Sequence, residues 1–444
     1  MRNLIFALLP LLALIVASPF ILEEVGGANP RPPAQLRSDL KPAARELMSR
    51  AFEGIDSTKL VDYHTHVAGI GAGGTGNFVH PDMRSWLHPV KRLTFSVYLS
   101  ASGINNIENA DREALLRLVD LIHYDESDGK HVLLPFDKNY DADGTVNLEK
   151  TQFYVPNEYV FAAAEEFPDK FIPGISVHPY RPDAIEELER WAARKARVVK
   201  WLPNAMGIDP SDPRCDPFYE KMRELDLILL AHAGREEAVD AEEDQRLGNP
   251  LLLRRALDHG VKVIIAHCAG LGLGEDLDSP GREMVPNFDL FMRLMDDKKY
   301  EGLLFADISA VTQHNRLGPA LATLIERGDL HHRLVNGSDY PLPAINIVIR
   351  TKSLVEAGYI TEAEREQLNE IYSFNPLLFD FVLKRTIRAP GTDKRFAPSI
   401  FMANRSLAPL RNHAVAGSTQ SASEKWQLTR PRRSLPGSVG AGCL

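Results

Sequence analysis

Apolar residues in the central part of the chain fall into short continuous runs, separated by stretches in which they recur with a helical period. The runs predict strands at residues 60–66, 131–136, 171–177, 198–202, 227–232, 261–267, 303–308 and 334–337. Helical periodicity is clearest at residues 183–194, 216–225, 251–259 and 319–327. Strands of continuous apolar character that alternate with helices predict a parallel sheet covered on both faces.

Eight such units in succession are typical of an α/β fold of the (β/α)8 TIM barrel type, with an open doubly wound sheet as the alternative. We predict a linker and leading helix at residues 25–57, the barrel at 58–388, and a largely disordered C-terminal extension at 389–444. The leading helix is expected at residues 42–52, and closing helices at 344–356, 361–371 and 376–384.

The N-terminal residues 1–24 carry a targeting signal. An uncharged apolar segment at residues 4–22 follows Arg2 and precedes two glutamates. At ~1.5 Å per residue a helix of this length just spans a bilayer. The segment predicts either a secretory signal peptide or a retained membrane anchor, and Pro19 favours the anchor. The flanking charges predict that the main body lies outside the cytoplasm.

Charge and cysteine content exclude several classes of protein. The formal net charge of −9 argues against nucleic-acid binding, and an excess of basic residues follows Arg388. Cys215, Cys268 and Cys443 are odd in number and far apart, which predicts neither a disulfide framework nor a cysteine zinc site. We expect a small-molecule substrate, membrane contact through the N-terminal segment, and leave a homo-oligomer open.

Residues able to bind a metal stand at the ends of five predicted strands. The first strand ends in Val61-Asp-Tyr-His-Thr-His66, where the alternation of a strand puts His64 and His66 on the same side. The other ends carry Lys200, His232, His267 and Asp339. In a barrel these ends converge on one mouth, and nitrogen and carboxylate ligands suit zinc, iron or manganese. We therefore predict one or two divalent metal ions, with zinc favoured.

This set of residues, in this order, resembles the amidohydrolase superfamily over residues 60–379, and more narrowly its amidohydrolase-related branch of metal-dependent TIM-barrel hydrolases. The resemblance implies that His64, His66, His232 and Asp339 hold a first metal. It also implies that Asp339 accepts a proton from the activated water. For His267 it implies one of two roles, as a ligand of a second metal or as an uncoordinated group that polarises the substrate.

Lys200 separates the two arrangements that the resemblance allows. In binuclear family members a strand-four lysine is carboxylated by CO2 and bridges the metals, and the stretch Val199-Lys-Trp-Leu-Pro-Asn-Ala205 resembles its surroundings in dihydroorotases. In mononuclear relatives, which include decarboxylases, a lysine here is a structural or substrate-contacting cation. Both roles stay open from the sequence.

Other residues near the strand ends are candidates for supporting roles. His178 follows the third strand and is a candidate for substrate binding, with capping of the next turn as the alternative. Asp307 and Ser309 stand near the end of the seventh strand, and they too are candidates either for substrate binding or for capping the next turn. Asp62 is placed to orient a metal ligand.

Two long insertions, at residues 69–130 and 269–300, follow the first and sixth strands at the end where active-site loops belong. The first begins with Gly71-Ala-Gly-Gly-Thr-Gly76, which fits a dinucleotide-binding motif formally but lacks the following helix and acidic residue. We instead expect a flexible loop whose backbone amides contact an anionic substrate.

The hypothesis that follows is an exported or anchored hydrolase that cleaves an amide, lactone or related carbonyl bond by metal-activated water. A mononuclear non-oxidative decarboxylase of the same superfamily is the first alternative. A membrane-tethered binding protein without catalysis is the second, and the complete set of candidate ligands argues against it.

Overall fold

The computed structural model describes Val25 and residues 31–407 of the chain. The predicted signal or anchor at residues 4–22 and the part of the predicted C-terminal extension at residues 408–444 lie outside the described residues. In the part of the chain that is described, no helix is both long enough and apolar enough to cross a bilayer. Export and membrane anchoring stay predictions.

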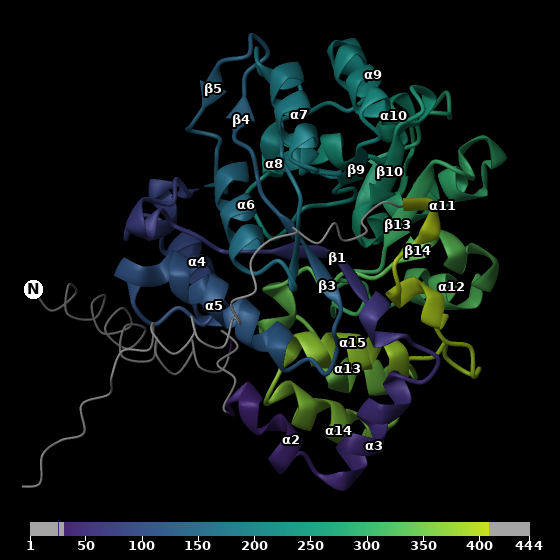
Figure 1. The fold of residues 1–444 in the computed structure, drawn as a ribbon. Coiled ribbons are helices and arrows are strands. Elements are labelled where there is room, and N and C mark those ends of the chain that lie inside the picture. Colours follow the sequence, from purple (N-terminus) through teal and green to yellow (C-terminus); the bar gives the residue numbers. More distant parts are fainter. Residues whose placement is uncertain (1–24, 26–30, 408–444) are drawn as a thin grey trace, which may run out of the picture. The chain divides into compact units, whose positions relative to one another are not determined.

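The predicted strands are all present, and they pair in parallel (Figure 1). One sheet has three strands in the order β1-β3-β7, and the other has five in the order β14-β13-β10-β9-β8. Their bounds are β1 Val61–His66, β3 Lys130–Leu134, β7 Phe171–Pro173, β8 Val198–Trp201, β9 Ile228–Ala231, β10 Lys262–Ile265, β13 Leu304–Asp307 and β14 Leu334–Val335. The expectation of an α/β fold with parallel strands is therefore confirmed.

Backbone hydrogen bonds connect the edges of the two sheets at both joins. Beyond the end of β7, Ile175 N donates to Val198 O of β8 over 2.8 Å, and Lys200 N donates to Ile175 O over 2.7 Å. After β14, Asp339 N donates to His64 O of β1 over 2.7 Å. The strands are thus assigned to two sheets and not to one continuous closed sheet. Hydrogen bonds nevertheless join the segment after β7 to β8 and the segment after β14 to β1.

Helices follow most of the strands along the chain. Their bounds are α2 Leu36–Asp39, α3 Pro42–Ala51, α4 Pro89–Ala101, α5 Ala110–His123, α6 Asn157–Glu166, α7 Ala184–Ala193, α8 Pro203–Met206, α9 Asp216–Glu224, α10 Arg254–Asp258, α11 Asn287–Asp296, α12 Pro319–Glu326, α13 Thr351–Glu356, α14 Glu362–Tyr372 and α15 Pro376–Thr386. The leading helix α3 packs against α14 and α15 (Figure 1). Thr361 and Glu364 form the capping box that begins α14.

The predicted closing helix at residues 344–356 is wrong over its first half. The structure has a helical turn at Leu342–Ala344, no helix at residues 345–350, and α13 only from Thr351. Residues 345–350 include three isoleucines and a valine, whose branched side chains lower helix propensity, and Ile345 and Ile349 are buried. Burial of these side chains therefore outweighs the helical periodicity of the sequence, and the segment does not form a helix.

Alternating side chains of the strands pack on opposite faces. Val198, Leu230 and Ile264 belong to a cluster enclosed between the strands, whereas their neighbours Val199 and Leu229 face the helices. Both faces are buried, as a parallel sheet requires. Residues 389–407, in the predicted C-terminal extension, add buried Phe396, Ile400 and Phe401 to the core on the helical side.

The two insertions carry regular structure that sequence analysis did not assign. The first contains α4, α5 and a two-residue strand β2 (Phe78–Val79), which pairs with β6 (Phe153–Tyr154) from the segment after β3. The second contains the antiparallel strands β11 (Leu273–Glu275) and β12 (Met284–Pro286) followed by α11. Both insertions therefore contain regular secondary structure, and the first one covers the candidate site described below.

A buried ion pair makes the stability of this fold depend on pH. His131 on β3 lies with its Nδ1 3.3 Å from Asp62 Oδ2 and its Nε2 3.7 Å from Asp125 Oδ2. Burial alone would lower the pKa of His131, but hydrogen bonds to Asp125 and Asp62 outweigh it and raise the pKa to about 9. Because this value exceeds the usual 6.5, the stabilisation is complete below about pH 6.5 and is lost as the pH rises through about 9.

We expect the free energy of unfolding to fall by on the order of 3 kcal/mol between pH 6.5 and pH 9.5 because of this pair. Urea denaturation at the two pH values measures it. In His131→Gln the fall should disappear, and stability at pH 6.5 should already be reduced. His123→Gln, which changes an exposed histidine, is the control and should behave as the wild type. Equal pH dependence in His131→Gln and the wild type would contradict this assignment.

Candidate metal centre

The predicted ligands come together at the C-terminal ends of the strands. His64 and His66 lie in the C-terminal half of β1, and Lys200 lies in β8. His232 directly follows β9, and His267 lies two residues after the end of β10. Asp339 follows β14 in the loop that hydrogen-bonds to β1. Because parallel strands end at the same edge, side chains from distant parts of the sequence become neighbours here.

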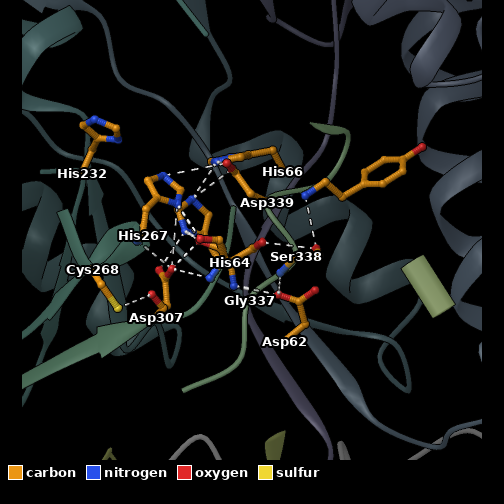
Figure 2. Close-up of polar contacts among 12 residues, drawn as sticks. Asp62, His64, His66, His232, His267, Cys268, Asp307, Gly337, Ser338 and Asp339 are labelled. Carbon is orange, nitrogen blue, oxygen red and sulfur yellow. Dashed lines mark hydrogen bonds and ion pairs between the residues drawn. The ribbon is translucent and has the colours of Figure 1, made fainter. Parts of the chain in front are cut away.

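Three side chains have their ligand atoms within 4.8 Å of one another, namely His64, His66 and Asp339 (Figure 2). The Nε2 atoms of the two histidines are 3.1 Å apart, and Asp339 Oδ1 lies 3.4 Å from the first and 3.5 Å from the second. His267 adjoins this group, since its Nε2 lies 3.8 Å from Asp339 Oδ2. Nitrogen and carboxylate oxygen atoms arranged this way fit a divalent transition metal.

His232 supplies a further nitrogen at this centre. Its ring centroid lies 5.2 Å from that of His267, and its Nδ1 lies 3.3 Å from Glu236 Oε2. Its Nε2 is buried and has no hydrogen-bond partner among the described residues. A buried polar atom is rarely left unpaired in a protein, so this nitrogen also fits a metal ligand.

Asp307 and Ser309 orient two of these histidines. Asp307 Oδ2 accepts a hydrogen bond from His64 Nδ1 over 2.9 Å, and Asp307 Oδ1 accepts from His267 N over 3.0 Å and from Ser309 Oγ. With its Nδ1 proton held by Asp307, His64 directs the lone pair of Nε2 toward Asp339 and His66. His66 is fixed similarly, because its Nδ1 lies 3.3 Å from Leu134 O.

Lys200 lies at the floor of this site. It is buried, with 2% of its surface exposed, and its Nζ lies 3.0 Å from His64 Nε2. Burial lowers the pKa of Lys200, although the charges of Asp339, Asp307 and Glu236 oppose this. The lowered pKa of Lys200 favours the neutral amine, the form that can react with CO2.

Burial sets the protonation of the other groups in the same way. It lowers the pKa of His64, His66, His232 and His267 well below the usual value, so all four rings are neutral imidazoles, the form that binds a metal. Burial raises the pKa of Asp339, against the opposing charge of Lys200. A carboxyl group with a raised pKa is a suitable proton acceptor near neutral pH.

Two site residues have a backbone conformation that side chains rarely adopt. The φ angles of His267 and Asp339 are 56° and 59°, in the left-handed region. Close packing fixes the segment before Asp339, because an added Cβ at Gly337 would lie 2.7 Å from His64 Cβ and 3.1 Å from Ser309 Cβ. Gly337 therefore allows the loop to approach β1.

Gly337→Ala should displace His64 and weaken metal binding by about 10- to 100-fold, the usual effect of disturbing groups around a ligand. Competition with a chelating dye measures the affinity. The matched control is Gly302→Ala, since an added Cβ at Gly302 meets nothing within 4 Å. If both variants bind metal as tightly as the wild type, the close contact at His64 is not needed for the site.

His178 lies away from this centre. Its Nε2 lies 2.9 Å from Met206 O, its backbone N donates to Asp137 Oδ2, and it does not line the cavity above the site. Its contacts are those of a core residue, and its role in substrate binding stays a prediction. Sequence analysis missed Glu236, which contacts His232 from a loop that carries no motif.

A cavity of about 140 Å³ opens over the centre. Its floor consists of the histidines, Lys200 and Asp339, and α4 contributes Phe95, Tyr98 and Leu99 to its wall. The predicted ligands therefore lie at the floor of a cavity in which a small molecule can bind.

Comparison with known proteins agrees with this geometry. A family model described as amidohydrolase matches residues 61–377. No curated protein matches the chain. Solved structures with a similar fold include an uncharacterised TIM-barrel protein from Bordetella bronchiseptica, with 15% identity and a TM-score of 0.43 over 70% of this chain and 99% of that one.

Two further similar structures are 4-oxalomesaconate hydratase from Rhodopseudomonas palustris and an IDCase from Metarhizium anisopliae. The first has 19% identity and a TM-score of 0.38 over 69% of this chain and 92% of that one. The second has 14% identity and a TM-score of 0.38 over 76% of this chain and 98% of that one. At these values the likenesses carry no information about the reaction.

Proposed function

Because this chain belongs to the amidohydrolase family, we propose that it is a metal-dependent hydrolase that cleaves an amide, lactone or related carbonyl bond with water. The observation that carries the proposal is the convergence of neutral histidines and a carboxylate of raised pKa at the floor of one cavity. This arrangement combines metal ligands with a proton acceptor, as hydrolysis of a carbonyl compound requires.

We further infer that the strands act as one (β/α)8 barrel. The hydrogen bonds from Ile175 to β8 and from Asp339 to β1 support it, because they join the inner edges of the two sheets. The parallel pairing and the location of all candidate ligands at one end of the strands also support it.

His64, His66, His232 and Asp339 would hold the first metal. A divalent metal there would lower the pKa of water to about 7 and polarise the substrate carbonyl. Asp339 Oδ2, on the side of His267, would take the proton of the attacking water and pass it to the leaving group. Asp307 would keep His64 in the tautomer that leaves Nε2 free.

The hydrogen bonds of His267 favour its role as a second ligand. Ser309 Oγ donates to Asp307, so its lone pair accepts the Nδ1 proton of His267 over 2.7 Å. Nε2 then carries a lone pair and cannot donate a hydrogen bond to a substrate carbonyl. This supports two metals, with His267 and a carboxylated Lys200 as ligands of the second.

The proposal is tested with the purified protein by elemental analysis and by assays with neutral lactones, esters and amides. Hydrolysis should be lost when a chelator removes the metal and should return when Zn²⁺ or Mn²⁺ is added. A decarboxylase would instead release CO2 from a carboxylic acid and leave these neutral compounds intact. Hydrolysis that is unchanged in protein shown to be free of metal would also overturn the proposal.

A further inference from the structure

The cavity above the candidate metal centre has apolar walls. Aromatic and aliphatic side chains surround it, among them Phe95 and Leu99 of α4, Phe136, Phe153 and Val155. Apart from the groups on the floor, the ionisable side chains that line it are Glu236 and Tyr98. A ligand that rises from the floor would therefore contact mostly carbon atoms.

Helix α4 covers the cavity and is held in place from both ends. Tyr98 Oη donates to Ala238 O over 2.9 Å, and Lys91 Nζ lies 3.0 Å from Asp240 Oδ2. These contacts tie the first insertion to the loop after β9. The phenol of Tyr98 is thereby paired with protein, so its ring, and not a free hydroxyl group, faces the cavity.

Groups that could bind an anion are already engaged or lie outside the lining. The carboxylate of Asp111 accepts hydrogen bonds from the backbone amides of Ile70, Gly71 and Ala72, at 2.6, 3.1 and 3.3 Å. The expectation that this glycine-rich loop offers its amides to an anionic substrate is therefore not supported. Lys200 is hydrogen-bonded to His64, and Glu236 adds negative charge to the wall.

Arg316 is a further cation to consider as an anion-binding group near the cavity. It is buried, and its Nε and Nη1 have no hydrogen-bond partner among the described residues. It does not line the cavity, however, and it lies in the field of the carboxylates Glu236, Asp339 and Glu237. Its charge therefore compensates these carboxylates behind the wall.

We propose that the substrate is a neutral lactone, ester or amide with an apolar substituent that fills this cavity, and that Phe95, Tyr98 and Leu99 of α4 determine the specificity. This inference rests on the proposed function, because the reacting carbonyl must lie over the metal centre. A dry apolar cavity of about 150 Å³ holds a benzene ring. A cavity of about 140 Å³ therefore has room for a phenyl group or a short alkyl chain.

A series of γ-lactones with side chains that increase by one methylene tests the proposal. The value of kcat/KM should rise about fourfold per methylene, from the ~0.8 kcal/mol gained by burying each one, until the cavity is full. A lactone of equal length that ends in a carboxylate should react at least 100 times more slowly. Preference for the carboxylate compound, lost in Arg316→Met, would overturn the proposal and assign an anionic substrate.

Two variants of α4 distinguish an effect on the cavity wall from a general effect on the helix. Leu99→Asn changes the wall and should reduce the gain per methylene to less than twofold. Leu93→Asn makes the same change at a residue of α4 that is 43% exposed and absent from the lining, and it should keep the wild-type series. Equal effects of the two substitutions would contradict a role of the wall in specificity.

Binding without catalysis distinguishes a wrong substrate class from a wrong reaction. 3-Alkylcyclopentanones, in which a methylene replaces the ring oxygen of a γ-alkyl-γ-lactone, have the shape of the lactones but cannot be hydrolysed, and calorimetry measures their binding to the metal-loaded protein. Affinity that rises about fourfold per methylene supports the apolar substrate even if no lactone is hydrolysed, in which case the proposed reaction alone fails. Affinity independent of chain length, together with active hydrolysis, would overturn the apolar substrate alone.

Discussion

Asp339→Asn should reduce kcat for the proposed hydrolysis by about 1,000-fold, since proton transfer by a positioned side chain contributes roughly 10²- to 10⁴-fold. Asparagine keeps the size of the side chain but cannot accept a proton at neutral pH, and it is a weaker metal ligand. Asp339 contacts three candidate ligands at once, with Oδ1 near His64 and His66 and Oδ2 near His267. No other described carboxylate has these contacts.

Initial rates at saturating lactone, with metal added in excess, measure this effect. The excess metal matters because it separates lost proton transfer from lost affinity. Asp329→Asn, the same change at an exposed carboxylate, is the control and should be as active as the wild type. An Asp339→Asn enzyme that retains more than about a tenth of wild-type activity would exclude Asp339 as the proton acceptor.

The strand ends could be predicted from the sequence because two simple rules act there. Side chains alternate along a strand, and parallel strands end at one edge, so His64, His66, Lys200 and Asp339 had to become neighbours. Asp307 followed from the same rule, although its contact with His64 Nδ1 was not expected. These rules place residues at one edge of the sheet, but they do not predict which atoms of those residues contact one another.

The cover of the cavity could not be predicted, because its contacts join segments with no pattern in common. The hydrogen bond from Tyr98 to Ala238 spans 140 residues. The glycine-rich loop was expected to offer its amides to a ligand, but Asp111, on a helix 40 residues further along, accepts them instead. In both cases a tertiary contact decides the role of a segment whose local sequence allows several.

The same limit applies to the support of the Asp339 loop. Lys384 on α15 is fully buried, and its Nζ donates to Gly337 O over 2.6 Å and to Asp380 Oδ2 over 2.5 Å. A helical period does not distinguish this lysine from an exposed one four residues after an aspartate. Only packing of α15 under the loop makes the pair a support of the site.

Lys200→Ala should cause the largest change in the number of metal ions bound at the site. With bicarbonate present, the wild type should bind about two metals per chain and the variant one or none, since a carboxylated lysine can bridge two metal ions. The position of Nζ, 3.0 Å from His64 Nε2, and the lowered pKa of the amine both favour carboxylation. Lys298→Ala, at an exposed lysine, should bind metal as the wild type does.

Small molecules that replace the missing side chain then identify which form of Lys200 acts. If the lysine is carboxylated, acetate or propionate should restore the second metal and part of the activity to Lys200→Ala, because each supplies the lost bridging carboxylate. If it acts as a free cation, methylamine should restore activity with no change in metal content. One metal in both wild type and variant would assign the cation, leave His267 without a second metal to bind, and make decarboxylation an equal candidate for the reaction.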